Sequence, residues 1–227
     1  MTSTFDNHAA RYSDEVQSSI SFSGLRHDFF LQAKVDVLAR TLRRNFGAAP
    51  PGTALDIGCG VGLLHPYIEP LFGKLTGADI SAASIEQAQR LSPSVAYSMM
   101  GESLPYDDGA FDVTLTVCVL HHVPPERWDS FTREMRRVTR PGGLVCVIEH
   151  NPFNPLTQLA ISRCSFDADA VLLRASKTRE LLRKAGAKKI TTEFFLTLPA
   201  RGGFFGRLGR LAGRLPIGAQ YLTAARA

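Results

Sequence analysis

The chain lacks an apolar run of about 18 residues, the length that a transmembrane helix needs. Its N-terminus lacks the basic-then-apolar pattern of a secretory signal. Cysteine is scarce, because the four cysteines among 227 residues are widely spaced and form no C-x-x-C pair. These absences argue against a membrane-spanning protein, a disulfide framework and a zinc cluster. They favour a reduced, cytoplasmic protein with no metal site.

Acidic residues are few in the C-terminal part of the chain. From Lys177 onward there are 11 Lys and Arg residues against two acids, although the net charge of the whole chain is only +5. RNA recognition would need basic residues interleaved with exposed aromatic ones, and Phe204-Phe205, the aromatic pair set among the arginines of this part, is expected to pack. We therefore expect a solvated basic face and no nucleic-acid partner.

What the sequence does contain is a glycine turn between a strand and a helix. The stretch A-L-D-I-G-C-G-V-G, residues 54–62, is an apolar strand that ends in glycines. Glycine lets backbone N–H groups approach a ligand, and the N-terminus of the following helix adds positive potential. The spacing is G-x-G-x-G and not the G-x-G-x-x-G of dinucleotide sites, because Leu63 stands where a third glycine would fall.

Strands and helices alternate after this turn, which predicts one doubly wound, mostly parallel α/β sheet of seven strands. A helical segment, residues 1–50, precedes a core at 51–150, and 151–227 supplies a pocket wall and closing antiparallel strands. Within this single domain we expect strands near 54, 75, 95–99, 113–119, 144–148, 190–198 and 220–224, a turn at 140–143, and helices at 27–46, near 64, from 82, at 126–138 and at 177–185.

Several phrases of the sequence resemble the class I S-adenosylmethionine-dependent methyltransferases, in their small-molecule, type 11-like branch. D-I-G-C-G-V-G is similar to their first motif, and Asp79 to the acid that ends their second strand. The later phrases are L-P-Y-D-D-G-A-F-D from Leu104, V-L-H-H-V from Val119 and R-V-T-R-P-G-G from Arg137. The N-terminal phrase F-D-N-H-A-A-R-Y, residues 5–12, resembles a helical lid that folds over the cofactor.

The resemblance implies S-adenosylmethionine as cofactor. Asp56 would serve its amino group, and Asp79 would accept hydrogen bonds from the two ribose hydroxyls, for which the two oxygens of a carboxylate are suited. Where the family has an adenine-binding acid this chain has Met100, so Gly101, Glu102 or packing on Met100 would hold adenine instead. The remaining cofactor contacts implied are Tyr12, Gly58, Cys59, Gly60, Gly62, Ile80 and Cys118.

Candidate catalytic groups follow the fourth and fifth strands, at the edge where parallel sheets bind ligands. A base is needed only if the acceptor keeps its proton near neutral pH. His121 and His122 are candidates, of which adjacency predicts that at most one enters the pocket. His150 and the lid residue Tyr12 are the others, and the substrate pocket is expected to include Arg26, Asn151 and Asn154.

These residues predict methyl transfer to O, N or C of a small-molecule acceptor, by a monomer or homodimer. One alternative is internal cyclisation of the cofactor, which would release methylthioadenosine and a cyclic amino acid. Another is a lipidic acceptor at a membrane surface, since residues 201–215 could form an interfacial helix with arginines on one face and apolar side chains on another.

Overall fold

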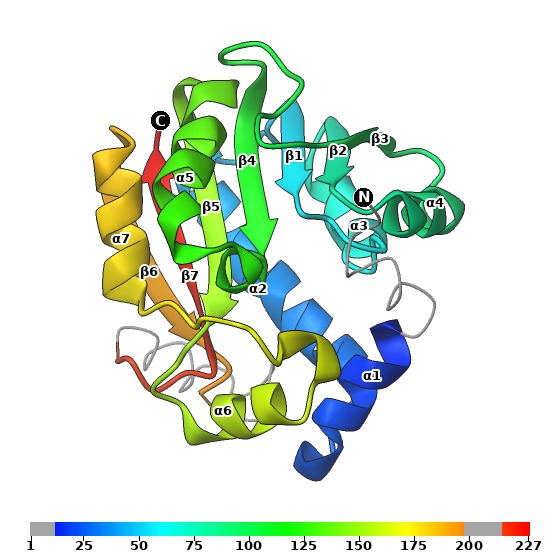
Figure 1. Ribbon diagram of the computed structural model, residues 1–227. Helices are drawn as coiled ribbons and strands as arrows, with labels where there is room; N and C mark the ends of the chain where they lie inside the picture. The colour runs from blue at the N-terminus through cyan, green and yellow to red at the C-terminus, as the bar shows by residue number, and fades with distance from the viewer. Residues whose placement is uncertain (1–11, 198–214) are drawn as a thin grey trace.

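Seven strands form one sheet in the order β3-β2-β1-β4-β5-β7-β6 (Figure 1). The computed structural model describes residues 12–197 and 215–227. The strands are β1 (Thr53–Ile57), β2 (Lys74–Asp79), β3 (Ala96–Met99), β4 (Phe111–Val117), β5 (Thr139–His150), β6 (Lys188–Phe195) and β7 (Gln220–Arg226). The α-helices are α1 (Tyr12–Ser19), α2 (His27–Phe46), α3 (His65–Ile68), α4 (Ala82–Leu91), α5 (Trp128–Val138), α6 (Pro155–Ser162) and α7 (Ala175–Lys184).

The sheet is parallel except at β7, which runs antiparallel to both of its neighbours. This confirms the predicted mostly parallel, doubly wound fold. The last two strands do not simply extend the edge in chain order, because β7 is inserted between β5 and β6. The predicted turn at 140–143 lies inside β5, where the register with β4 shifts and Gly142 adopts a positive φ of 76°.

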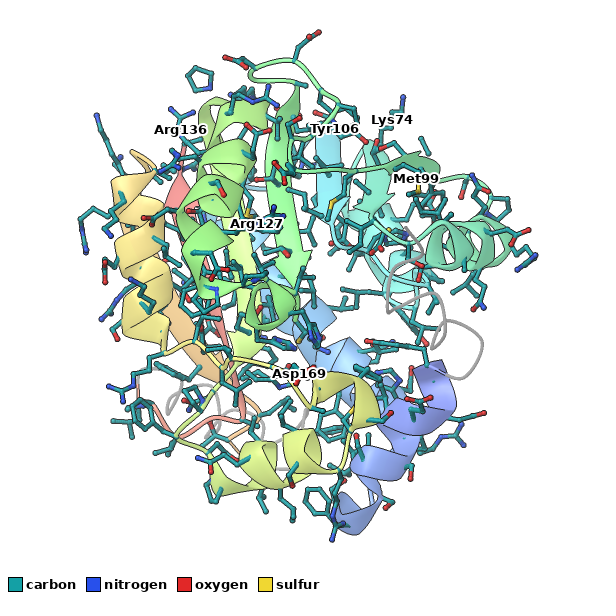
Figure 2. All side chains as sticks on the ribbon, in the orientation of Figure 1. Lys74, Met99, Tyr106, Arg127, Arg136 and Asp169 are labelled. Carbon is teal, nitrogen blue, oxygen red and sulfur yellow. The ribbon has the colours of Figure 1, made fainter. Side chains whose placement is uncertain are left out.

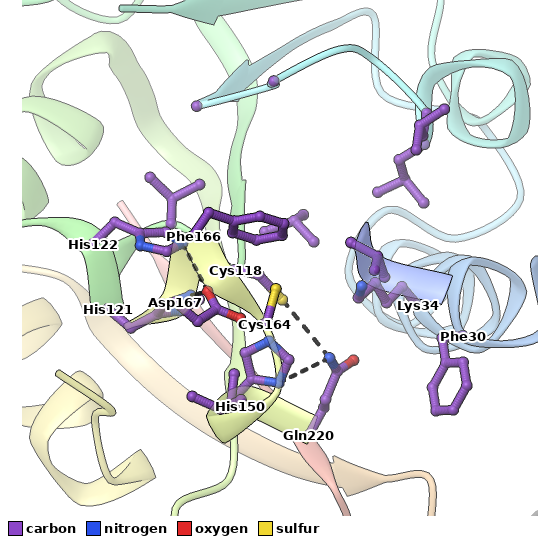
Figure 3. Close-up of a pocket in the computed structure, with 18 of the residues that line it drawn as sticks. Phe30, Lys34, Cys118, His121, His122, His150, Cys164, Phe166, Asp167 and Gln220 are labelled. Carbon is purple, nitrogen blue, oxygen red and sulfur yellow. Dashed lines mark hydrogen bonds and ion pairs between the residues drawn. The ribbon is translucent and has the colours of Figure 1, made fainter. Parts of the chain in front are cut away.

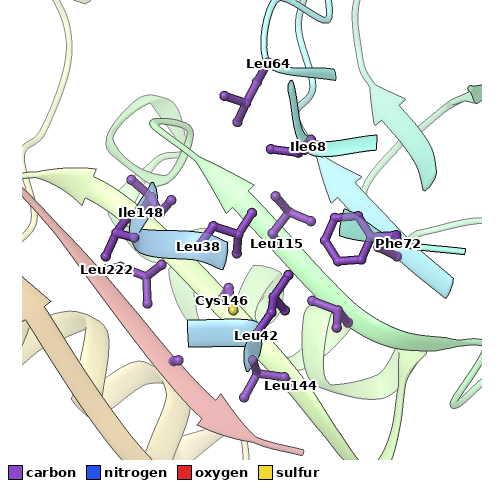
Figure 4. Close-up of a cluster of buried hydrophobic side chains, with 14 of the residues drawn as sticks. Leu38, Leu42, Leu64, Ile68, Phe72, Leu115, Leu144, Cys146, Ile148 and Leu222 are labelled. Atoms are coloured by element: carbon purple, nitrogen blue, oxygen red, sulfur yellow. The ribbon is translucent and has the colours of Figure 1, made fainter. Parts of the chain in front are cut away.

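Alternate residues of the strands face two separate hydrophobic clusters. On one face, Leu38 and Leu42 of α2 pack against the sheet beside Leu144, Cys146 and Ile148 (Figure 4). On the other face, α5 and α7 pack against the intervening strand residues, such as those at 145 and 147. Burying a leucine of this kind contributes about 1.5–3 kcal/mol relative to leaving it exposed. The sheet is thereby held between two helical layers.

The helical segment before the sheet has two distinct parts. Helix α2 is a core helix, since Val37 and Leu38 are completely buried. Helix α1 instead contacts α6 and the loop after it, where Ser165 donates a hydrogen bond to Glu15 at 2.6 Å. Residues 5–11 of the expected lid and 201–214 of the expected interfacial helix lie outside the described residues.

The carboxyl ends of the parallel strands meet at one end of the sheet. Lys74, at the start of β2, lies at the opposite end of the molecule from Asp169, which lies near those strand ends (Figure 2). Among residues 12–197 and 215–227, no helix combines the length and apolar character that crossing a bilayer requires.

Candidate active site

A cavity of about 760 Å³ opens at the carboxyl ends of β1, β2, β4 and β5. This volume lies within the range of small-molecule sites, roughly 300–1,000 Å³. The strand order reverses between β1 and β4, which is the place where open α/β sheets bind ligands. One half of the cavity is formed by the glycine turn and the end of β2. The other half is formed by the ends of β4 and β5, the segment after α6 and the start of β7.

The glycine turn and Asp79 hold one another in place. Gly60 donates its backbone N–H to Asp79 Oδ2 at 2.7 Å, and Ser81 donates to Oδ1 at 2.9 Å. Burial raises the pKa of Asp79, and these backbone donors oppose the rise. Gly58 has a φ of +76°, and a Cβ there would lie 2.6 Å from the side chain of Val119. The turn therefore requires glycine at this position, and it brings its backbone close to the cavity.

Asp56 is held by a histidine that the sequence analysis did not single out. His65 is fully buried, and its Nε2 lies 3.1 Å from Asp56 Oδ2 while its Nδ1 lies 2.8 Å from the hydroxyl of Tyr97. A ring with its proton on Nε2 satisfies both contacts. Asp56 Oδ1 is buried and has no hydrogen-bond partner in the described part of the chain. A cationic amino group in the cavity would supply the missing donor.

The expected adenine contacts lie along the outer side of the same half. Met100 donates its backbone N–H to the carbonyl of Asp79, and Ile80 is 45% exposed, so an apolar surface flanks the carboxylate. Glu102 lines the rim, where it is paired with Arg127. This leaves Met100 and Gly101 as the better-placed surface for a planar base.

In the other half, four side chains form a charged network, and Figure 3 shows three of them, His121, His122 and Asp167. Glu149 Oε1 accepts the backbone N–H groups of Val119 and Leu120, and its Oε2 lies 2.6 Å from His121 Nδ1. His121 Nε2 and His122 Nε2 lie 3.5 Å and 3.2 Å from the same oxygen of Asp167. Contrary to expectation, both histidines line the cavity. They lie in a short 3₁₀ helix, Leu120–His122, where their rings are 4.1 Å apart.

The charges of this network are balanced by their own contacts. Burial opposes protonation of His121, but Glu149 and Asp167 outweigh it and raise its pKa to about 9. Burial also opposes ionisation of Glu149 and Asp167, yet the histidines keep both pKa values below the usual range. His121, His122 and Asp167 also bring possible metal-ligand atoms within 4.8 Å of one another. The ion pairs themselves account for the arrangement, and we assign no metal to it.

His150 and Cys118 are joined through a residue of β7. Gln220 directs its amide nitrogen to His150 Nδ1 at 3.3 Å and to Cys118 Sγ at 3.7 Å (Figure 3). Burial and the nearby positive charge of His121 lower the pKa of His150 to about 3, so the ring is uncharged at neutral pH. Burial raises the pKa of the Cys118 thiol to about 12. Cys118 has a φ of +57°, a strained conformation for a non-glycine residue.

Tyr12 closes the cavity from α1. Its ring stacks on Phe166 with centroids 5.0 Å apart, and burial raises its pKa. The carboxylates of Asp167, in one half of the cavity, and Asp79, in the other, both act on Tyr12. The tyrosine therefore lies between the two halves.

Two expected pocket residues lie elsewhere. Arg26 precedes α2 and does not line the cavity. Asn151 is almost completely buried. Its side-chain amide donates hydrogen bonds to the carbonyls of Pro216 and Gly218, and these bonds hold the chain that precedes β7. Asn154 does line the cavity, but its oxygen caps α6 by accepting the N–H of Thr157. The other predicted site residues border the cavity: Tyr12, Asp56, Gly58, Cys59, Gly60, Gly62, Asp79, Ile80, Met100, Gly101, Glu102, Cys118, His121, His122 and His150.

Sequence reasoning missed Lys34, Asp167 and Gln220, which all line the cavity. Lys34 carried a signal, because it lies on the buried stripe of α2 with Leu38 and Thr41, where a charged residue is unusual. Asp167 and Gln220 carried none, since each reaches the site only through the fold.

Comparison with known proteins agrees with this geometry. Residues 55–147 match the family described as methyltransferase domain. A 2-methyl-6-phytyl-1,4-hydroquinone methyltransferase of Synechocystis is 33% identical over 129 residues, which are 54% of this chain and 40% of that protein. A ubiquinone/menaquinone biosynthesis C-methyltransferase of Hahella chejuensis is 29% identical over 175 residues, 72% of this chain and 65% of that protein.

The fold has similar solved structures as well. A Thermotoga maritima S-adenosylmethionine-dependent methyltransferase, titled a possible histamine N-methyltransferase, has a TM-score of 0.69 at 19% identity, over 98% of this chain and 97% of that one. The chain spans between about a third and a half of the length of the first curated relatives. Residues 55–147 are thus similar to a methyltransferase domain, and the chain as a whole has the fold of the S-adenosylmethionine-dependent methyltransferases.

Proposed function

We propose that the protein transfers the methyl group of S-adenosylmethionine to a small-molecule acceptor. The observation that carries this proposal is one continuous cavity in which Asp79 and the unsatisfied oxygen of Asp56 face one half and the His121 network lines the other. The first half suits a nucleoside with an amino-acid tail, and the second offers room for an acceptor. The methyltransferases among the relatives support the same reaction class.

The residues fit the cofactor on three counts. Asp79 retains acceptor capacity for the ribose hydroxyls, because each of its oxygens can accept more than one hydrogen bond. Asp56 Oδ1 would accept from the methionine ammonium, and Met100 with Gly101 would pack on adenine. The cofactor supplies an electrophilic methyl group on a sulfonium. The protein then has only to position the acceptor, exclude water and, for a neutral hydroxyl, remove a proton.

His122 is the better candidate for moving that proton. It is partly exposed to the cavity and contacts Asp167 at 3.2 Å. His121 is held as a cation between two carboxylates, and His150 has a pKa of about 3, so neither is suited to act as a base near neutral pH. Tyr12 would close over the sulfonium, which an aromatic face attracts.

Calorimetry with S-adenosylhomocysteine, followed by product analysis with S-adenosylmethionine, tests the proposal. We expect binding, and S-adenosylhomocysteine as product once an acceptor is supplied. Methylthioadenosine formed without an acceptor would instead identify internal cyclisation, and absence of binding by the folded protein would contradict both reactions.

A further inference from the structure

Lys34 is a buried ammonium in the acceptor half of the cavity. It lies in the middle of α2, on the face that packs on the sheet, and only 8% of its surface is exposed. Its side chain nonetheless lines the cavity, and its nitrogen points from α2 toward the side where Cys118, His150 and Gln220 lie (Figure 3). A lysine whose end faces a cavity from a core helix is positioned to contact whatever fills it.

No described side chain pairs with this ammonium, either by a hydrogen bond or by a salt bridge. Its charge acts on Cys118, His150 and His27, and none of these supplies a negative charge near neutral pH. Outside the described residues, the sequence of 198–214 contains no Asp or Glu, and that of 1–11 contains one acid, Asp6. Burying a charge without a partner is costly, so Lys34 differs from the rest of the cavity.

The other charged groups that line the cavity have partners. His121 lies between Glu149 and Asp167, Arg127 is paired with Glu102, and Asp79 accepts backbone N–H groups. Among the described residues, Asp56 keeps one oxygen free for a cationic group of the cofactor, and Lys34 is the cation for which a ligand would supply an anionic partner.

The position of Lys34 favours the acceptor over the cofactor as the source of that partner. The groups on which its charge acts include Cys118 and His150, at the ends of β4 and β5. Phe30 and Phe166 add aromatic surface to the same cavity.

We propose that the acceptor is an aromatic or otherwise apolar acid whose carboxylate binds the Lys34 ammonium. This inference rests on the proposed function, because it assigns the acceptor half of the same cavity. A carboxylate would satisfy the buried charge with a charge-assisted hydrogen bond. A protonated amine would be repelled both by Lys34 and by the cofactor sulfonium, so Lys34 selects against cationic acceptors.

Binding of acids and their neutral amides to the protein loaded with S-adenosylhomocysteine tests the proposal. The probes are benzoate, 4-hydroxybenzoate and cinnamate, each compared with its own amide by calorimetry. We expect at least one acid to bind about 10- to 150-fold more tightly than its amide, the range for a hydrogen bond to a charged group. The Lys34→Met variant should lose that preference, while Lys34→Arg should keep part of it. Three acids that bind no better than their amides would overturn the assignment.

A second measurement separates the acceptor from the cofactor. S-adenosylhomocysteine and methylthioadenosine are compared in wild type and Lys34→Met, because only the first carries a carboxylate. We expect both affinities to stay within about twofold of wild type. A selective loss of tenfold or more for S-adenosylhomocysteine would show that Lys34 holds the cofactor and would overturn the proposal.

Failure of the proposed function and failure of the Lys34 assignment give different results. Wild-type protein that binds no S-adenosylhomocysteine would contradict the proposed function, whereas the acid and amide comparison without nucleoside would still report on Lys34. Folding of Lys34→Met is checked by thermal unfolding. Methionine fills a similar volume and removes a buried charge, so we expect the variant to be at least as stable as wild type.

Discussion

The two halves of the cavity are built in different ways. The cofactor half consists mainly of backbone, because the turn at residues 58–62 and the N–H groups around Asp79 come from consecutive stretches of chain. The acceptor half consists of side chains from distant segments, including Lys34, His121, Asp167 and Gln220. A half made of backbone tolerates little change in what it binds, whereas a half made of side chains can change its ligand by substitution.

The largest effect is expected on folding stability, when the buried cation of the acceptor half, His121, is removed. His121→Ala would leave Glu149 without its cation and Asp167 with His122 as its remaining histidine, and breaking a buried pair in this way costs about 3–5 kcal/mol of folding stability. Urea unfolding measures the loss. Lys184→Ala, which breaks an exposed ion pair, is the control and should change little. Equal stability of His121→Ala and wild type would show that the network does not support the fold.

In the cofactor half, replacing a buried charged side chain by alanine should weaken ligand binding more than it lowers folding stability. Asp79→Ala removes the acceptor for the ribose hydroxyls and is expected to weaken S-adenosylhomocysteine binding by about 10- to 150-fold. Calorimetry measures this, with the exposed Asp107→Ala as a matched control. Unchanged affinity in Asp79→Ala would place the ribose elsewhere.

The pH dependence of stability should reveal the His121 proton. Its folded pKa of about 9 lies above the unfolded value of about 6.5, so the bound proton stabilises the fold fully below pH 6.5. That contribution is lost as the pH rises through 9. Between pH 7 and 8 the slope approaches that of one proton, about 1.4 kcal/mol per pH unit. Unfolding free energies of wild type and His121→Ala at both pH values test this, and identical slopes would contradict it.

The smallest effect is expected for Tyr12, which lies where the two halves of the cavity meet, and it is an effect on turnover. At saturating cofactor, Tyr12→Ala should lower turnover by about 2- to 30-fold, the range of a cation–π contact, and by more than Asp79→Ala does. Tyr12→Phe retains the ring that stacks on Phe166 and serves as the control. Equal losses at saturation in the Tyr12→Ala and Asp79→Ala variants would remove the tyrosine from its assigned place.

The same contrast explains what could be predicted from the sequence. The alternating strands, the glycine turn, Asp56 and Asp79 form local patterns, and the structure places all of them in the sheet or around the cavity. Both histidines enter the cavity because a 3₁₀ turn brings adjacent rings together, which strand-like alternation does not allow. Asp167 and Gln220 depend on how α6 and β7 dock, and no local pattern encodes that.

The inserted strand also has a consequence for how the molecule is made. Residues 139–150 can hydrogen-bond to β4 as soon as they leave the ribosome, but their other edge is completed only when residues 220–226 have been synthesised. In the interval, the run Val145, Cys146, Val147 and Ile148 presents an open apolar strand edge, which other chains can join. We expect translation that stalls before residue 220 to yield aggregates.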